Sequence, residues 1–154
     1  MSENPKPVRA GLVTLLTLVL TFGVTAAATA ASHTAYSDPG YYTVAGVQYQ
    51  NQAMIYTEDV SHLAKALTQI KAPSQAVSSG TVGTLGRLFH SNGSLQCSGT
   101  YAYNSGTLPA GVNHTSWSCA VYQQDAWYSK GTTKAWNGGG YTEWFTFQSR
   151  NQNS

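Results

Sequence analysis

The sequence offers one pair of carboxylates for acid–base chemistry, Asp125 and Glu143, and each of them lies beside aromatic residues. In most glycoside hydrolases two such carboxyl groups flank the scissile bond of a sugar. The alternative interpretation is structural: Asp125 caps a loop, and Glu143 pairs with Lys130 or Lys134 across two strands. We therefore assign no catalytic residue and keep a small secreted glycoside hydrolase, using Asp125 and Glu143, as the alternative function.

The other polar residues form no catalytic, nucleotide-binding or metal-binding motif. The sequence lacks the patterns G-x-S-x-G, H-E-x-x-H and G-x-G-x-x-G, and it has no P-loop. Its four histidines are scattered along the chain: His33, His62, His90 and His114. The members of a Ser–His–Asp triad need only meet in space, so the many serines make that possibility uninformative. We predict no metal site and no cofactor.

The N-terminal segment 1–30 has the features of a secretory signal peptide. Lys6 and Arg9 precede an apolar run at 12–20, and small residues follow up to the pattern at 28–30. An uncleaved anchor is the alternative, because this uncharged stretch could nearly cross a bilayer. We favour cleavage, because the second half of the uncharged stretch is rich in Ala and Thr and only weakly apolar. The mature chain is then expected outside the cell.

The two cysteines, Cys97 and Cys119, predict one disulfide. Thiols of small exported domains pair in oxidising compartments, whereas a metal site would need further ligands and a C-x-x-C motif is absent. A catalytic thiol is the remaining alternative. Each cysteine lies on the apolar face of its expected strand, so we expect a buried bridge between strands or sheets.

Composition excludes several classes of protein. Of 154 residues, 42% are hydrophobic and only 9% are charged, with a formal net charge of +2. Disordered chains carry few aromatics and much charge, and nucleic-acid binders need a dense Lys/Arg surface, so neither class fits. No charged residue lies between Arg87 and Asp125, so this stretch suits neutral partners.

Surplus aromatic residues are the strongest functional signal. The chain has ten Tyr and four Trp, more than a core of about 120 residues can bury. Tyr and Trp join an apolar ring to a polar group, which suits binding surfaces. The candidate binding residues are Trp127, Tyr128, Trp136, Tyr141 and Trp144. The structural alternative puts Trp117, Trp127 and Trp136 in the core.

These residues predict a non-enzymatic binding module. We expect its partner to be another extracellular protein, slightly favoured over a neutral glycan, and neither a nucleic acid nor, after signal cleavage, a membrane. A glycan would need at least two coplanar exposed rings in a shallow groove. The segment 32–56 also offers a strand that could extend the sheet of another protein.

One stretch has helical spacing. Its apolar residues recur at intervals of three and four, and Pro73 follows, so we predict a short amphipathic helix over about 59–71. These residues are Val60, Leu63, Ala64, Leu67 and Ile70.

Everything else indicates strands and turns. Residues 41–56 predict one or two strands, and 91–94 and 137–140 predict tight turns. The expected fold is mainly β: an antiparallel sandwich or partly closed barrel with one helix and one disulfide. Its parts are a flexible segment 31–40, a single β-rich domain 41–150 and a polar tail 151–154.

From about Val82 to residue 152, the sequence resembles small exported proteins of Gram-positive bacteria whose function is uncharacterised. The resemblance rests on RLFHSNGSL at 87–95, YNS at 103–105, WYSKG at 127–131 and AWNGGGY at 135–141. These motifs consist of turn and strand residues. The resemblance therefore implies a secreted β-domain and supplies no catalytic residue.

Overall fold

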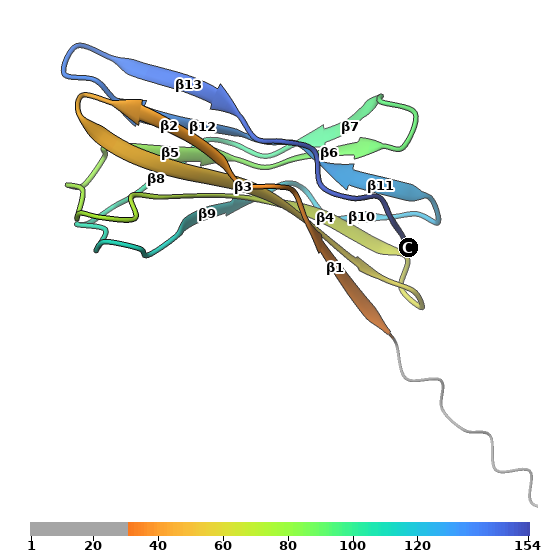
Figure 1. Ribbon diagram of the computed structural model, residues 1–154. Helices are drawn as coiled ribbons and strands as arrows, with labels where there is room; N and C mark the ends of the chain where they lie inside the picture. Colours follow the sequence, from red (N-terminus) through yellow and green to blue (C-terminus); the bar gives the residue numbers. More distant parts are fainter. Residues whose placement is uncertain (1–30) are drawn as a thin grey trace, which may run out of the picture.

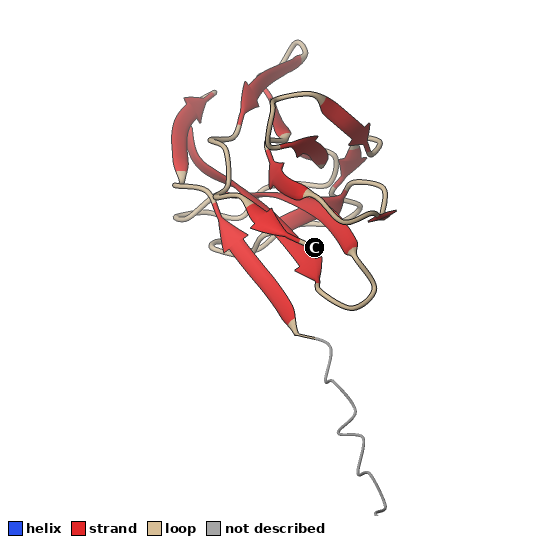
Figure 2. Cartoon of the chain, turned by 90° about the vertical axis from the view of Figure 1, so that its right-hand side faces the viewer, coloured by secondary structure: helices blue, strands red, loops and turns tan. Residues whose placement is uncertain are grey.

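A computed structural model describes residues 31–154, and these form a sandwich of antiparallel β-sheets without a helix (Figures 1 and 2). The predicted signal peptide lies outside the described residues. The strands are β1 (Ser32–Tyr36), β2 (Gly40–Val44), β3 (Val47–Glu58), β4 (Leu63–Lys71), β5 (Val82–Leu85), β6 (Arg87–His90), β7 (Leu95–Ser98), β8 (Ala102–Tyr103), β9 (His114–Trp117), β10 (Val121–Tyr122), β11 (Ala126–Ser129), β12 (Thr132–Trp136), β13 (Tyr141–Phe145) and β14 (Gln152–Asn153).

The first layer is a six-stranded sheet, sheet 1, built on the long hairpin β3–β4. Strands β1 and β2 pair with the two halves of β3. On the other side of the hairpin, β9 and β10 pair with the two halves of β4. The central strands thus span the whole length of the sandwich, as Figure 1 shows.

The second layer consists of two four-stranded sheets. Sheet 2 has the order β13-β12-β5-β8, and sheet 3 has the order β14-β11-β6-β7. The chain passes directly from β5 to β6 through Gly86, and from β11 to β12 through Lys130 and Gly131. Sheets 2 and 3 are therefore the two halves of one bent layer, which lie over opposite ends of sheet 1 in Figure 1.

Glycines allow the layers to approach closely at this bend. A Cβ on Gly86 would come within 2.6–2.9 Å of backbone atoms of Ser118, Trp117 and Ala66. A Cβ on Gly131 would meet the Thr68 side chain and the backbone oxygen of Leu85. Real Cβ atoms do not tolerate such distances, so the bend requires residues without a side chain.

The interior is divided into two apolar cores. The first core, between sheets 1 and 2, contains Val44, Tyr49, Ile70, Ala72, Val77, Val82 and Ala135. The second core, between sheets 1 and 3, contains Ala35, Ile55, Ala64, Ala66, Leu88 and Trp127. Four buried polar residues lie between the two cores, one on each central strand, and form a polar seam: Asn51, Thr68, Thr84 and Thr133. Asn51 Nδ2 donates to Thr133 Oγ1 at 3.0 Å within this seam.

The helix predicted over 59–71 is wrong: most of this segment is β4, paired along its length with β3. The apolar spacing was ambiguous, because Leu63 and Leu67 lie on the outer face of sheet 1 whereas Ala64 and Ile70 lie on the inner one. The small residues Ala64, Ala66 and Ala72 fit the closely packed inner face. Pairing with β3 therefore overrides the local helical pattern.

The disulfide is confirmed, with 6.2 Å between the Cα atoms of Cys97 and Cys119, a normal spacing. It joins β7 to the loop between β9 and β10 and so links sheet 3 to sheet 1. The expectation that it is buried is wrong, because Cys119 is exposed and Cys97 only half-buried. The bridge lies at the rim because Cys119 follows β9 in an irregular segment.

Both ends of the described chain have more structure than the sequence indicated. Residues 32–36, expected in a flexible segment, form β1. In the expected polar tail, β14 pairs with β11, and the buried Ser154 Oγ accepts a hydrogen bond from Trp127. The predicted turns are confirmed: 91–94 joins β6 to β7, with Gly93 at φ +93°, and 137–140 joins β12 to β13.

Candidate functional site

Two predicted binding residues, Trp136 and Tyr141, lie together on the outer face of sheet 2. They are cross-strand partners on β12 and β13. Tyr101 and Tyr103, from β8 and the residues before it, lie on the same side of the sheet and complete a cluster that we call the aromatic face. Its members are Tyr101, Tyr103, Trp136 and Tyr141.

The rings of the aromatic face contact one another in a chain. Ring centroids are 5.1 Å apart for Trp136 and Tyr141, 4.9 Å for Tyr141 and Tyr103, and 6.1 Å for Tyr103 and Tyr101. Trp136 is 43% exposed, Tyr141 40% and Tyr103 39%. Three rings therefore offer apolar surface to solvent while their neighbours hold them in place.

A glycine makes room for this cluster. Gly83 on β5 pairs with Tyr103, and a Cβ at Gly83 would come within 2.7–2.8 Å of the Tyr103 ring. The ring thus lies directly on the backbone of β5. A side chain at this position would lift Tyr103 off the sheet.

One ion pair neutralises the charge next to the aromatic face. Lys134 Nζ is 3.3 Å from Glu143 Oε2 across β12 and β13, and 3.9 Å from the centroid of the Tyr101 ring. This is the structural role that the sequence allowed for Glu143. Burial raises the pKa of the Tyr101 hydroxyl, which contacts Thr132 Oγ1 at 2.7 Å. Tyr101 thus remains a neutral phenol.

A shallow pocket of about 290 Å³ opens beside the two most prominent rings. It is lined by Ser79, Gly80, Thr81, Trp136 and Tyr141. The Tyr141 hydroxyl donates to the carbonyl oxygen of Gly80 and so fixes the ring against the 79–81 loop. The pocket has polar backbone on one side and aromatic rings on the other.

The other three predicted binding residues do not join this surface. Trp127 is fully buried in the second core, and Tyr128 is buried beneath its stacked neighbour Phe89 at 5.1 Å. Trp144 faces inward and stacks on Tyr42 at 4.0 Å beside the first core. Trp127 and Tyr128 are buried, and Trp144 is half-buried against the first core, so none of the three contributes to the aromatic face.

Sheet 1 carries a second group of aromatic residues that the sequence analysis missed. Register places Tyr36, Met54, Leu67 and Trp117 in one row across β1, β3, β4 and β9. Lys65 Nζ lies 4.5 Å from the Trp117 ring and 5.3 Å from the Tyr56 ring. The predicted helix concealed this row, because period-two alternation in β4 would have placed Leu67 and Lys65 on one face.

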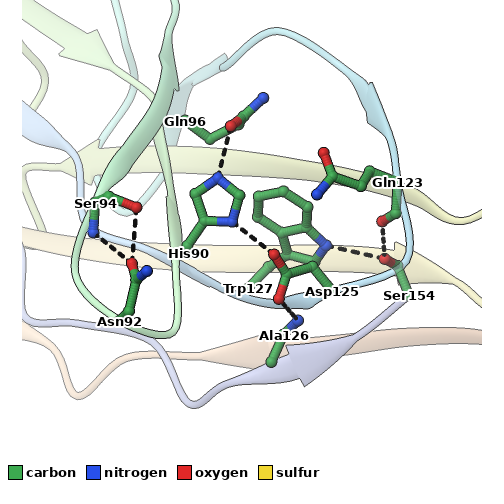
Figure 3. Close-up of polar contacts among 9 residues, drawn as sticks. All are labelled: His90, Asn92, Ser94, Gln96, Gln123, Asp125, Ala126, Trp127 and Ser154. Atoms are coloured by element: carbon green, nitrogen blue, oxygen red, sulfur yellow. Dashed lines mark hydrogen bonds and ion pairs between the residues drawn. The ribbon is translucent and has the colours of Figure 1, made fainter.

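Asp125 forms a compact polar cluster at the end of sheet 3 (Figure 3). Its Oδ2 atom is 2.7 Å from His90 Nδ1, and its Oδ1 atom accepts a hydrogen bond from the Ala126 amide. His90 Nε2 is 2.6 Å from Gln96 Oε1, and the imidazole lies 4.5 Å from the Trp127 ring. An ionised carboxylate can only accept, so His90 Nδ1 donates the hydrogen bond to Asp125 Oδ2.

Asp125 and Glu143 lie in different sheets: Asp125 directly precedes β11 of sheet 3, and Glu143 lies on β13 of sheet 2. Eight residues, most of them in the extended strands β11 and β12, lie between Asp125 and Lys134, the cross-strand partner of Glu143, so the two acids are on the order of 20–30 Å apart. A glycosidase pair needs about 10 Å or less. In a Ser–His–Asp triad a serine hydroxyl would occupy His90 Nε2, and here Gln96 occupies it. The structure thus does not bring Asp125 and Glu143 into one site.

The His90–Asp125 pair should make stability depend on pH. Hydrogen bonds to the side chains of Asp125 and Gln96 raise the pKa of His90 above its ordinary 6.5, whereas hydrogen bonds from the Ala126 amide and His90 lower the pKa of Asp125 below 3.8. The contribution of His90 to the free energy of unfolding is therefore complete below about pH 6.5, and it is lost as pH rises through the raised pKa. The contribution of Asp125 to the free energy of unfolding is lost as pH falls below about 3.8.

Thermal unfolding between pH 5 and 9 measures this effect. We expect the thermal midpoint of the wild-type protein to decrease as pH rises. The decrease should be smaller in His90→Gln. Equal pH profiles for the two proteins would show that the pair contributes nothing.

Comparison with known proteins gives no relative: no family model, curated protein or solved structure matches this chain. Among residues 31–154, no three His, Cys, Asp or Glu side chains converge as a metal site would require. The same residues include no helix long and apolar enough to cross a membrane.

Proposed function

We propose that this protein is a secreted, non-enzymatic binding module that recognises another extracellular protein through its aromatic face. One observation carries the proposal: Trp136, Tyr141 and Tyr103 contact one another on one side of sheet 2, and each remains about 40% exposed. Clusters of Trp and Tyr beside a pocket are typical of the residues that dominate protein interfaces.

The orientation of the rings favours a protein over a glycan. Tyr103 and Tyr141 are tilted by 49°, and Trp136 and Tyr141 by 71°. Flat sugar rings stack best on coplanar aromatic surfaces, and these angles give an uneven surface instead. The pocket beside Trp136 and Tyr141 has room for an apolar side chain of a partner. The Lys134–Glu143 pair leaves this region without net charge.

A double variant tests the proposal. Trp136→Ser with Tyr141→Ser removes the two most exposed rings of the aromatic face, whereas Tyr122→Ser removes a ring that is 70% exposed on β10 of sheet 1. Each immobilised protein is incubated with culture medium of the producing organism, and retained proteins are identified by mass spectrometry. We expect one stoichiometric partner on wild type and Tyr122→Ser, and at least tenfold less on the double variant, because loss of two hot-spot rings costs about 2 kcal/mol or more.

Two results would contradict the proposal. Equal capture by the double variant would place the interface elsewhere. Retention of wild type on insoluble polysaccharide, lost in the double variant and without any captured protein, would make the aromatic face a glycan site.

A further inference from the structure

Two cations lie side by side on the outer side of the bend in the second layer. Arg87 is the first residue of β6. Lys130 directly follows β11, the strand that pairs with β6. The Lys130 amide donates to the Arg87 carbonyl oxygen at 3.2 Å, so the two residues are cross-strand neighbours. The charged groups of both lie 5.9 Å from the centroid of the Phe145 ring, which is 61% exposed.

No carboxylate neutralises this pair within residues 31–154. The ion pairs among those residues are His33–Asp59, His90–Asp125 and Lys134–Glu143, and none of them involves Arg87 or Lys130. Like charges on neighbouring strands are unfavourable. Contact with Phe145 offsets part of that cost but cancels neither charge.

Arg87 also has an unused donor. Its Nε atom is buried and has no hydrogen-bond partner among the described residues. A buried N–H of a charged group costs free energy when no acceptor meets it. A guanidinium can bind the two oxygens of a carboxylate in a planar fork through its two terminal nitrogens, without using Nε. Nε itself is covered by protein, so the terminal nitrogens of the guanidinium are the donors that can meet an anion, and the uncompensated charge of the pair favours one.

We propose that Arg87, Lys130 and Phe145 form a carboxylate-binding site that receives an Asp or Glu side chain of the protein partner. Arg87 binds both carboxylate oxygens, Lys130 adds a second positive charge, and Phe145 excludes water from one side. The site adjoins the aromatic face, because Phe145 pairs with Thr132, whose hydroxyl contacts Tyr101. This inference rests on the proposed function and adds to it that the contacting segment of the partner is acidic.

A capped tetraglutamate peptide is the probe for this site. It is titrated into the ¹⁵N-labelled protein while the Nε–Hε signal of Arg87 is followed by NMR. We expect a saturable shift that weakens with added salt, because both partners are charged. Arg87→Gln and Lys130→Gln should each weaken binding on the order of tenfold, the usual effect of losing a hydrogen bond to a charged group.

Lys71→Gln is the matched control, because Lys71 lies on β4 in sheet 1, away from this site. Its affinity for tetraglutamate should equal that of wild type. Unchanged thermal midpoints of the three variants verify that each is folded.

Several outcomes would overturn the site. These are a shift no larger than the one with capped tetraglutamine, equal binding by all variants, or saturable binding of inorganic phosphate but not of tetraglutamate. The proposed function is judged separately by capture of the partner. If Arg87→Gln and Lys130→Gln retain the partner as wild type does while the aromatic double variant loses it, this site is refuted and the proposed function stands. If tetraglutamate binds as expected and no protein is captured, the carboxylate-binding site stands, but its assignment to a protein partner falls with the proposed function.

Discussion

Replacing Trp127 with alanine should lower the free energy of unfolding by about 3–5 kcal/mol, the usual cost of truncating a buried tryptophan. Trp127 is fully buried in the second core, opposite residues such as Ile55 of sheet 1. The substitution also removes the hydrogen bond that its Nε1 donates to Ser154 Oγ at 2.9 Å. Urea unfolding followed by circular dichroism measures the loss.

Two further variants keep this prediction decisive. Trp127→Phe retains most of the ring volume and should cost less, about 1–3 kcal/mol, so it yields a value even if the alanine variant does not fold. Trp117→Ala removes a tryptophan that is 41% exposed and should cost about 1 kcal/mol or less. Equal losses for Trp127→Ala and Trp117→Ala would contradict the placement of Trp127 in the second core.

Gly86→Ala should be strongly destabilising, with a loss of about 3 kcal/mol or more. The new Cβ would lie 2.6 Å from the Ser118 amide nitrogen and 2.9 Å from the Ala66 carbonyl oxygen. Both obstacles are backbone, so no side chain can rotate away, and the two layers would have to move apart. A thermal midpoint lowered by more than 10 °C is the expected readout.

Gly106→Ala is the matched control, because no atom lies within 4 Å of a Cβ at that position. It should be neutral or slightly stabilising, since alanine restricts the unfolded chain more than glycine does. A Gly86→Ala protein as stable as Gly106→Ala would mean that the layers are not in close contact at the bend.

Local signals predicted the β architecture well. Asn92-Gly93 and the three glycines at 138–140 indicated turns, because these residues accept unusual backbone angles. Cys97 and Cys119 were paired correctly from the expected redox environment. The helix over 59–71 failed because Leu63 and Leu67 cover the outer face of sheet 1, so apolar residues occur on both faces of β4 and simple alternation is hidden.

The candidate site could be predicted only in part. Side chains alternate between the inner and outer faces from β11 through the bend into β12, so Trp127 and Ala135 point inward while Trp136 points outward. The odd number of positions from Trp127 to Trp136 could be counted in the sequence, and it places the two side chains on opposite faces of the layer. By contrast, Arg87 and Lys130 become neighbours only through the pairing of β6 with β11, and nothing local to either residue indicates that contact.

The polar seam has a consequence for how this domain tolerates sequence change. Among residues 31–154, no buried apolar residue belongs to both cores, and the polar residues of the seam lie between them. Alterations of side-chain volume near Leu88 therefore have no shared apolar neighbour through which to disturb the packing beneath Trp136. Substitutions around the second core should therefore leave the packing beneath the aromatic face undisturbed, so the two ends of the sandwich can change in sequence independently.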